Sequence, residues 1–265
     1  MRQAWFAAAA WLIAFAAHGQ VLTGSDRIKL YPAAPAAGEY FVVAVTGSRG
    51  GSPSYAFTST TEVERNFVHL NAVVGGGDFA VGAVYRATGA ARAVDPGVYT
   101  IVLNATEQGR TLVLSQDQGT INVAATIQAR DPQYRNLAGP WYAPDEAGWG
   151  VNVTQGESGA LFAVWLTYDT FSDFANLGGG RPGEHNLWLV MSEGKWIAPN
   201  VFRGVLYYSH GTSLANPMIA SQHYLTAFGA VTMTFVSDTE MDFKVEGTLQ
   251  TTDIARTKRL QRLRF

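Results

Sequence analysis

Apolar and polar residues alternate through the C-terminal half of the chain and predict a series of β-strands. Val231, Met233 and Phe235 alternate with threonines, and after a polar turn Met241 and Phe243 alternate with charged residues. This period of two is typical of antiparallel strands with one buried and one solvated face. The segments with this pattern cover residues 137–142, 149–155, 160–168, 186–192, 203–209, 229–236, 241–247 and 256–264. A meander of about eight strands can close into an up-and-down barrel.

The N-terminal half has shorter apolar segments, separated by glycine, proline and aspartate. Phe41 and Val43 share one face of a predicted strand whose other face is also apolar. In the segment DPGVYTIV, Tyr99 begins a strand in the manner of the tyrosine corner of immunoglobulin-like sandwiches. Antibody domains have a cysteine two residues later, where this chain has Ile101. We therefore expect a disulfide-free Ig-like sandwich of about seven strands.

The two halves follow an apolar N-terminal segment with the features of a secretory signal. Arg2 precedes an apolar run at residues 4–17 that is followed by small residues, and the run is too short to span a bilayer. We expect cleavage after Gly19, with Ala16 as the alternative. The expected organisation is a signal peptide at 1–19, a sandwich at 20–125, a linker at 126–136 and a barrel-like domain at 137–265. The expected location is the periplasm or the cell exterior.

The composition argues against several classes of function. The formal net charge is -2, which gives no electrostatic argument for nucleic-acid binding. The chain has no cysteine, which excludes disulfides, thiol chemistry and a lipid anchor on cysteine. Arg259 and Gln261 lie on the same face as Phe265 in the last predicted strand, which makes that face too polar for lipid. We therefore expect a protein that does not span the membrane.

Two motifs invite a catalytic interpretation. The segment HGTSLANP resembles the nucleophile motif of subtilisin-like proteases, but Ser213 would need a parallel α/β core to bring a histidine and an aspartate to it. Strands flank the motif here, so we interpret it as a loop. Asp145 and Glu146 are adjacent between a proline and a glycine, which favours a turn over an acid–base pair. The histidines are scattered, so we predict no metal site. We also predict no cofactor and no enzymatic activity.

The tryptophans provide the strongest indication of a binding site. Outside the predicted signal peptide, all five lie in the C-terminal half. Either they line a pocket for a small apolar or sugar-like ligand, or they fill the barrel core. With nearby polar side chains added, the candidate ligand-binding residues are Trp141, Trp149, Asn152, Trp165, Tyr168 and Trp188.

Several motifs of residues 137–265 resemble a module of many secreted proteobacterial proteins of unknown function. The matching segments are LAGPWY, PDEAGWGVNV, FAVWLTYD and LWLV, which correspond to G-x-W, E-x-G-W-G, W-x-T-Y-D and W-L in those proteins. An Ig-like domain in front of the module also resembles that group. The resemblance implies an architecture but no activity.

A wider resemblance is to the calycin barrels, the lipocalins and avidins. These begin with G-x-W and place an arginine from near the chain end over that tryptophan, where the guanidinium stacks on the indole. Gly139 and Trp141 match the motif. The resemblance implies that Arg262, or Arg264 on the same strand face, stacks on Trp141.

The strand pattern is interrupted at residues 170–186, where the resembling proteins have a short turn. Phe171, Phe174 and Leu177 share a face at helical spacing. This spacing predicts a short helix that acts either as a lid over the barrel mouth or as a plug within it.

Together these patterns predict an exported, non-catalytic protein that binds a small ligand or glycan at the mouth of the C-terminal barrel. The alternative is a cell-surface interaction or adhesion protein whose barrel is purely structural, with a hydrolase as a third possibility. A cavity lined by Trp141 and Trp165 would favour the binding protein. Aromatic side chains exposed on the outer wall would favour the interaction or adhesion protein. Carboxylates that converge in a cleft would favour the hydrolase.

Overall fold

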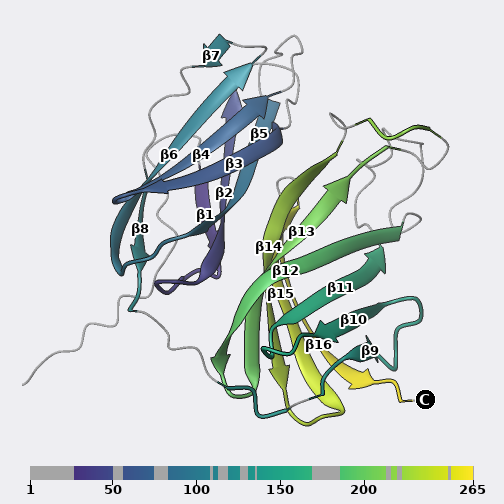
Figure 1. Ribbon diagram of the computed structural model, residues 1–265. Coiled ribbons are helices and arrows are strands. Elements are labelled where there is room, and N and C mark those ends of the chain that lie inside the picture. The colour runs from purple at the N-terminus through teal and green to yellow at the C-terminus, as the bar shows by residue number, and fades with distance from the viewer. Residues whose placement is uncertain are drawn as a thin grey trace, which may run out of the picture.

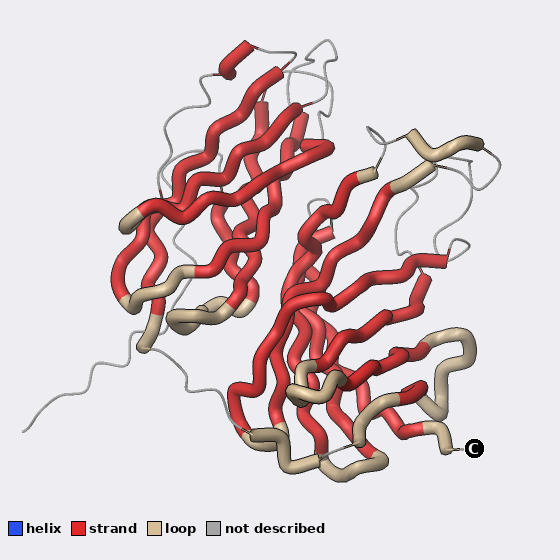
Figure 2. Tube along the Cα trace, viewed as in Figure 1, coloured by secondary structure: helices blue, strands red, loops and turns tan. Residues whose placement is uncertain are grey.

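The computed structural model describes residues 27–49, 56–74, 83–107, 110–112, 119–125, 131–134, 136–168, 186–212, 216–219, 223–249 and 252–264. Within these ranges the chain forms strands, turns and bends and contains no helix, which confirms the all-β prediction. Figure 2 shows that strands make up most of the described chain in both halves. The predicted signal peptide and the helix expected after residue 170 lie outside the described residues.

The N-terminal half is a two-sheet sandwich (Figure 1). One sheet has the order β1-β2-β5, formed by β1 (Arg27–Tyr31), β2 (Tyr40–Arg49) and β5 (Ala83–Arg92). The other contains β3 (Ala56–Glu64), β4 (Phe67–Val74), β6 (Gly97–Glu107), β7 (Arg110–Leu112) and β8 (Gly119–Val123). Apolar side chains from both sheets form one core that includes Phe41, Val43, Leu70 and Ile101.

Tyr99 makes the corner contact that its position in the sequence predicts. Its hydroxyl donates a hydrogen bond of 2.9 Å to the backbone oxygen of Asp95, four residues earlier. One strand pair differs from a wholly antiparallel Ig-like arrangement, because β4 and β6 run parallel. The strand between them in sequence, β5, lies in the opposite sheet, so β6 returns beside β4 in the same direction.

The C-terminal half is a closed antiparallel barrel of eight strands, as predicted. The strands are β9 (Gly139–Tyr142), β10 (Gly150–Gln155), β11 (Leu161–Tyr168), β12 (Asn186–Ala198), β13 (Val201–His210), β14 (Tyr224–Phe235), β15 (Glu240–Leu249) and β16 (Thr252–Arg262). Pairing of Arg262 with Trp141 joins the last strand to the first and closes the barrel. The fourth strand of the barrel, β12, is longer than the predicted 186–192, and register shifts near Glu193 and Ala198 accompany the extension.

One end of the barrel is filled by aromatic side chains. Trp141 and Trp196 each lie with their ring centroid 5.7 Å from that of Phe235, and Trp196 lies 5.3 Å from Phe202. The indole N–H of Trp141 donates to the Leu137 oxygen at 3.1 Å. The buried indole donor of Trp141 at this end is therefore satisfied by the backbone.

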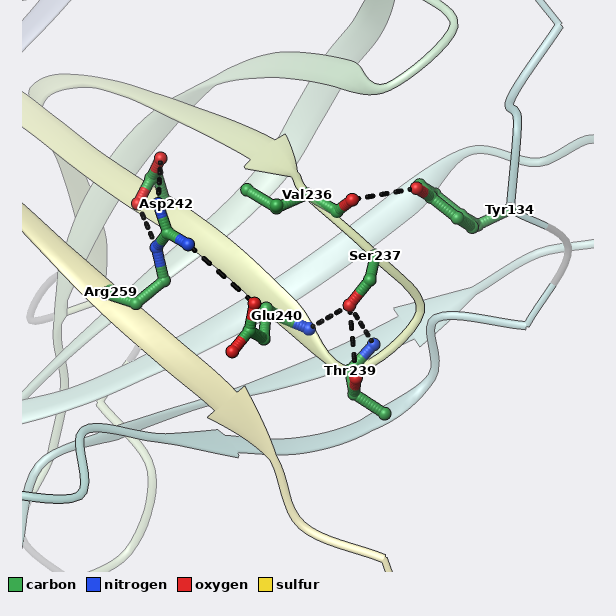
Figure 3. Close-up of polar contacts among 7 residues, drawn as sticks. All are labelled: Tyr134, Val236, Ser237, Thr239, Glu240, Asp242 and Arg259. Carbon is green, nitrogen blue, oxygen red and sulfur yellow. Dashed lines mark hydrogen bonds and ion pairs between the residues drawn. The ribbon is translucent and has the colours of Figure 1, made fainter.

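Arg262 covers the same end of the barrel. Its guanidinium lies 6.0 Å from the Trp141 ring centroid, which agrees with the expected stacking. The same group donates a 2.6 Å hydrogen bond to the Asn136 oxygen and another to the Ala138 oxygen. Nearby, the Tyr134 hydroxyl donates to the Val236 oxygen at 3.1 Å (Figure 3). Residues at the end of the predicted linker are thus part of the closure of the barrel.

The sandwich packs against the outer wall of the barrel. An apolar cluster joins Val42 and Ala44 of β2 to Val205 of β13 and Ala230 of β14. Figure 1 shows the sheet containing β2 beside β13 and β14. The sequence shows that both faces of β2 are apolar, and the barrel wall buries the face that the sandwich core does not.

A buried ion pair crosses this interface. Glu39 is 2% exposed, and its carboxylate lies 3.1 Å from the Arg203 guanidinium and accepts a hydrogen bond from the Ala36 amide. Burial lowers the pKa of the neighbouring Lys195, although the charge of Glu39 opposes that shift. The contact therefore combines apolar packing with a desolvated charge pair, and charge pairs of that kind are sensitive to the loss of one partner.

Candidate functional site

A cavity of about 370 Å³ opens at the barrel end opposite the packed aromatic core. It lies where β11 ends and β12 begins, and its volume falls in the range of small-molecule sites. Its lining is mainly apolar, with contributions from Trp149, Trp165, Leu187, Leu189, Phe228, Phe243, Val245 and Ile254.

Three aromatic rings form the base of this cavity. Trp149, Trp165 and Phe243 contact one another edge to face, with ring centroids 5.6–5.8 Å apart. Edge-to-face contacts fix ring orientation, so these residues provide a rigid apolar wall. Flat, rigid aromatic surfaces suit an apolar or sugar-like molecule because little side-chain entropy is lost on binding.

Trp165 carries a hydrogen-bond donor that no described residue uses. The residue is 8% exposed, and its indole nitrogen has no hydrogen-bond partner among the described residues. The indole nitrogens of Trp141 and Trp196, in contrast, donate to backbone oxygens at 3.1 and 2.8 Å. A buried donor without an acceptor is unfavourable by roughly 1–3 kcal/mol. An acceptor atom on a bound molecule would relieve this cost.

Charged side chains surround the mouth of the cavity. Glu146, Asp253, Arg256 and Lys258 all line it. Lys258 pairs with Glu146, and its ammonium lies 5.1 Å from the Trp149 ring centroid. The cavity thus combines an apolar interior with a polar rim, as small-molecule sites commonly do.

Strand alternation and one glycine position the side chains that line the cavity. In β16 the alternate residues Ile254, Arg256 and Lys258 follow the same inward phase as the buried Leu260. Gly247 is also required, because a Cβ there would lie only 2.7 Å from the Phe228 ring. Phe228 can therefore lie against the sheet and form a wall of the cavity.

The structure brings together three of the six predicted ligand-binding residues. Trp149, Trp165 and Tyr168 line the cavity. Trp141 is 1% exposed and belongs to the packed closed end. Asn152 is exposed in β10, between the buried Val151 and Val153.

The sixth predicted residue, Trp188, lies on the outer wall and is 58% exposed. Its strand partner Leu166 and the neighbouring Phe162 are exposed as well. All three are exposed apolar side chains of the barrel wall, and none of them lines the cavity.

Sequence reasoning missed several lining residues, including Leu189, Phe228 and Arg256. For Arg256 the signal was its phase in the alternating pattern, which points it inward, whereas Leu189 lies in the segment LWLV, which is apolar on both faces and gives no such signal. Phe228 lies near a register shift between β13 and β14, where simple alternation no longer predicts the facing of a side chain.

The described residues give little support to a catalytic function. Glu146 lines the cavity, but its neighbour Asp145 does not. Ser213 and the predicted lid residues Phe171, Phe174 and Leu177 lie outside the described residues. In the HGTSLANP segment, His210 is the last residue of β13, and the other described residues lie between β13 and β14, as expected for a loop.

Among the described residues, no group of three or more histidine, aspartate or glutamate side chains is arranged to hold a metal ion. The same part of the chain has no helix of the length and apolarity needed to cross a membrane. No protein-family model matches the sequence, and no curated protein or solved structure is significantly similar to it.

Proposed function

We propose that this is an exported, non-catalytic binding protein that holds a small, mainly apolar molecule in the mouth of its C-terminal barrel. The observation that carries the proposal is the mainly apolar cavity of about 370 Å³, one of whose lining residues, Trp165, has a buried indole N–H without a hydrogen-bond partner among the described residues. A suitable ligand has an apolar body that packs on the aromatic wall and an oxygen that accepts a hydrogen bond from Trp165.

The distribution of packing within the barrel supports this proposal. Aromatic side chains fill the closed end around Trp141 and Phe235, whereas the other end keeps open volume within a similar apolar lining. A barrel needed only for support gains stability from filling its core, since each void forfeits contacts. Retained volume at one end is what a binding role requires.

Native mass spectrometry of the full chain, purified gently from its own host, tests the proposal. We expect a reproducible extra mass of a few hundred daltons, consistent with the cavity volume. Ile254→Trp should abolish this mass, because Ile254 lies at the cavity rim and is half-buried, so a larger ring there blocks entry.

The matched control is Val236→Trp. Val236 is 46% exposed and lies at the closed end of the barrel, so this variant should keep the extra mass. A bare polypeptide mass in the wild type, or an adduct that survives Ile254→Trp unchanged, would refute the proposal.

A further inference from the structure

The first strand of the sandwich reaches the rim of the barrel cavity. Lys29 in β1 forms an ion pair with Asp253, a residue that lines the cavity. The Tyr31 hydroxyl donates to the same carboxylate at 3.2 Å and also hydrogen-bonds the buried Thr248. The sandwich therefore contacts, from the outer face of the barrel wall, the strand pair that forms one side of the cavity.

These contacts change the charge balance at the mouth. Four charged residues line the cavity, and among them Glu146 is neutralised by Lys258. Asp253 also lies at the cavity, in the opposite phase of β16 from Arg256, and Lys29 compensates its charge. Among the described residues Arg256 has no ion pair, so one cationic charge at the rim is uncompensated.

Arg256 is also placed to meet a ligand. It lies directly across from Val245 in the β15–β16 ladder, and Val245 is buried and lines the same cavity. Directly opposed residues of antiparallel strands project to the same side of the sheet. The guanidinium therefore belongs to the inner face, near the exit of an apolar cavity.

We propose that the cavity takes an amphipathic anion, a molecule with an apolar body and one carboxylate or comparable acidic group. Lys29 of the sandwich sets this preference by neutralising Asp253 and leaving Arg256 for the ligand. The inference rests on the proposed binding function, and it adds the ligand's charge and a role for the first domain. Lys29 acts as a positioning residue because its effect passes through Asp253.

Isothermal titration calorimetry on the full chain tests this inference with three probes of one length: octanoate, octan-1-ol and octylammonium. Octan-1-ol reports binding in the cavity without a charged head group, and the two ions report the sign of the charge at its mouth. The wild type should bind octanoate at least about tenfold more tightly than octylammonium at low ionic strength, because a rim cation attracts one head group and repels the other.

Lys29→Met should reduce this preference by about three- to tenfold while leaving the affinity for octan-1-ol unchanged. The double variant Lys29→Met with Asp253→Asn should restore the preference, because it removes the uncompensated carboxylate together with its partner. The control Lys244→Met removes an equal charge from an exposed pair with Glu246, outside the cavity lining, and should behave as the wild type.

The possible failures are distinguishable. If octan-1-ol binds but octanoate and octylammonium bind equally, or if Lys29→Met leaves their ratio unchanged, the charge inference is wrong and the binding function stands. If none of the three probes binds, the proposed function itself fails and the inference fails with it.

Discussion

Replacement of Arg203 by methionine should destabilise the barrel by breaking the ion pair that joins the two domains. Its partner Glu39 is 2% exposed, so the variant leaves a buried carboxylate without its cation. Breaking such a pair in a fully buried site costs about 3–5 kcal/mol. The Arg203 side chain is 22% exposed, and the nearby charge of Lys195 compensates in part. We therefore expect a loss of about 2–3 kcal/mol in the free energy of unfolding.

Intrinsic tryptophan fluorescence during urea unfolding measures this effect in the barrel specifically. Every tryptophan beyond the predicted signal peptide lies after residue 137, so the sandwich contributes no such signal. In thermal unfolding the same loss corresponds to a decrease in Tm of roughly 4–12 °C.

Two further variants separate the buried charge from general damage. Adding Glu39→Gln to Arg203→Met removes the unpaired carboxylate and should recover at least about half of the loss. Arg264→Met breaks an ion pair with Asp238 whose partners are both more than half exposed, so it should cost less than about 1 kcal/mol. The reasoning is refuted if Arg203→Met costs no more than Arg264→Met, or if the second substitution gives no recovery.

Three other changes test separate parts of the fold. Burial and the hydrogen bond to Glu193 raise the pKa of Tyr207. The stability that the protonated hydroxyl contributes is therefore complete below about pH 10 and is lost as the pH rises above that value. Tyr207→Phe should flatten the decline of the urea midpoint at alkaline pH. Gly229→Ala should cost about 2–4 kcal/mol in urea unfolding, because the new Cβ would overlap the backbone across the β14–β15 pair, whereas Gly156→Ala has room and should change stability by less than about 0.5 kcal/mol. Arg262→Met should cost about 1–3 kcal/mol in the same assay because it removes charged hydrogen bonds to two backbone oxygens; an unchanged midpoint would contradict its closing role.

The barrel strands were predictable because their alternation is regular. Val231, Met233 and Phe235 follow the period of two in sequence, and all three are buried in the structure. The same rule gives the outward facing of Asn152, since Val151 and Val153 occupy the inward phase. The segment LWLV around Trp188 is apolar on both faces, so its facing could not be assigned from alternation.

The division of tryptophans between core and cavity was not predictable from the sequence. Trp141 and Trp165 both point inward, but one lies at the filled end and the other at the open end. That difference depends on strand stagger around the closed barrel, which local patterns do not encode. The apolar second face of β2 indicated that something covers it, but not that the barrel wall does. The parallel pairing of β4 with β6 likewise depends on long-range topology.

The indole N–H resonances of isotopically labelled protein test the central claim most directly. Trp165→Phe assigns the resonance of the unpartnered donor, and octan-1-ol is then added to the wild type. We predict that the Trp165 resonance moves downfield with saturation, because its N–H gains an acceptor. The resonances of Trp141 and Trp196 should stay in place, since their donors are bonded to backbone oxygens. A Trp165 resonance that does not move, or equal shifts of all three, would contradict a ligand site in the mouth of the barrel.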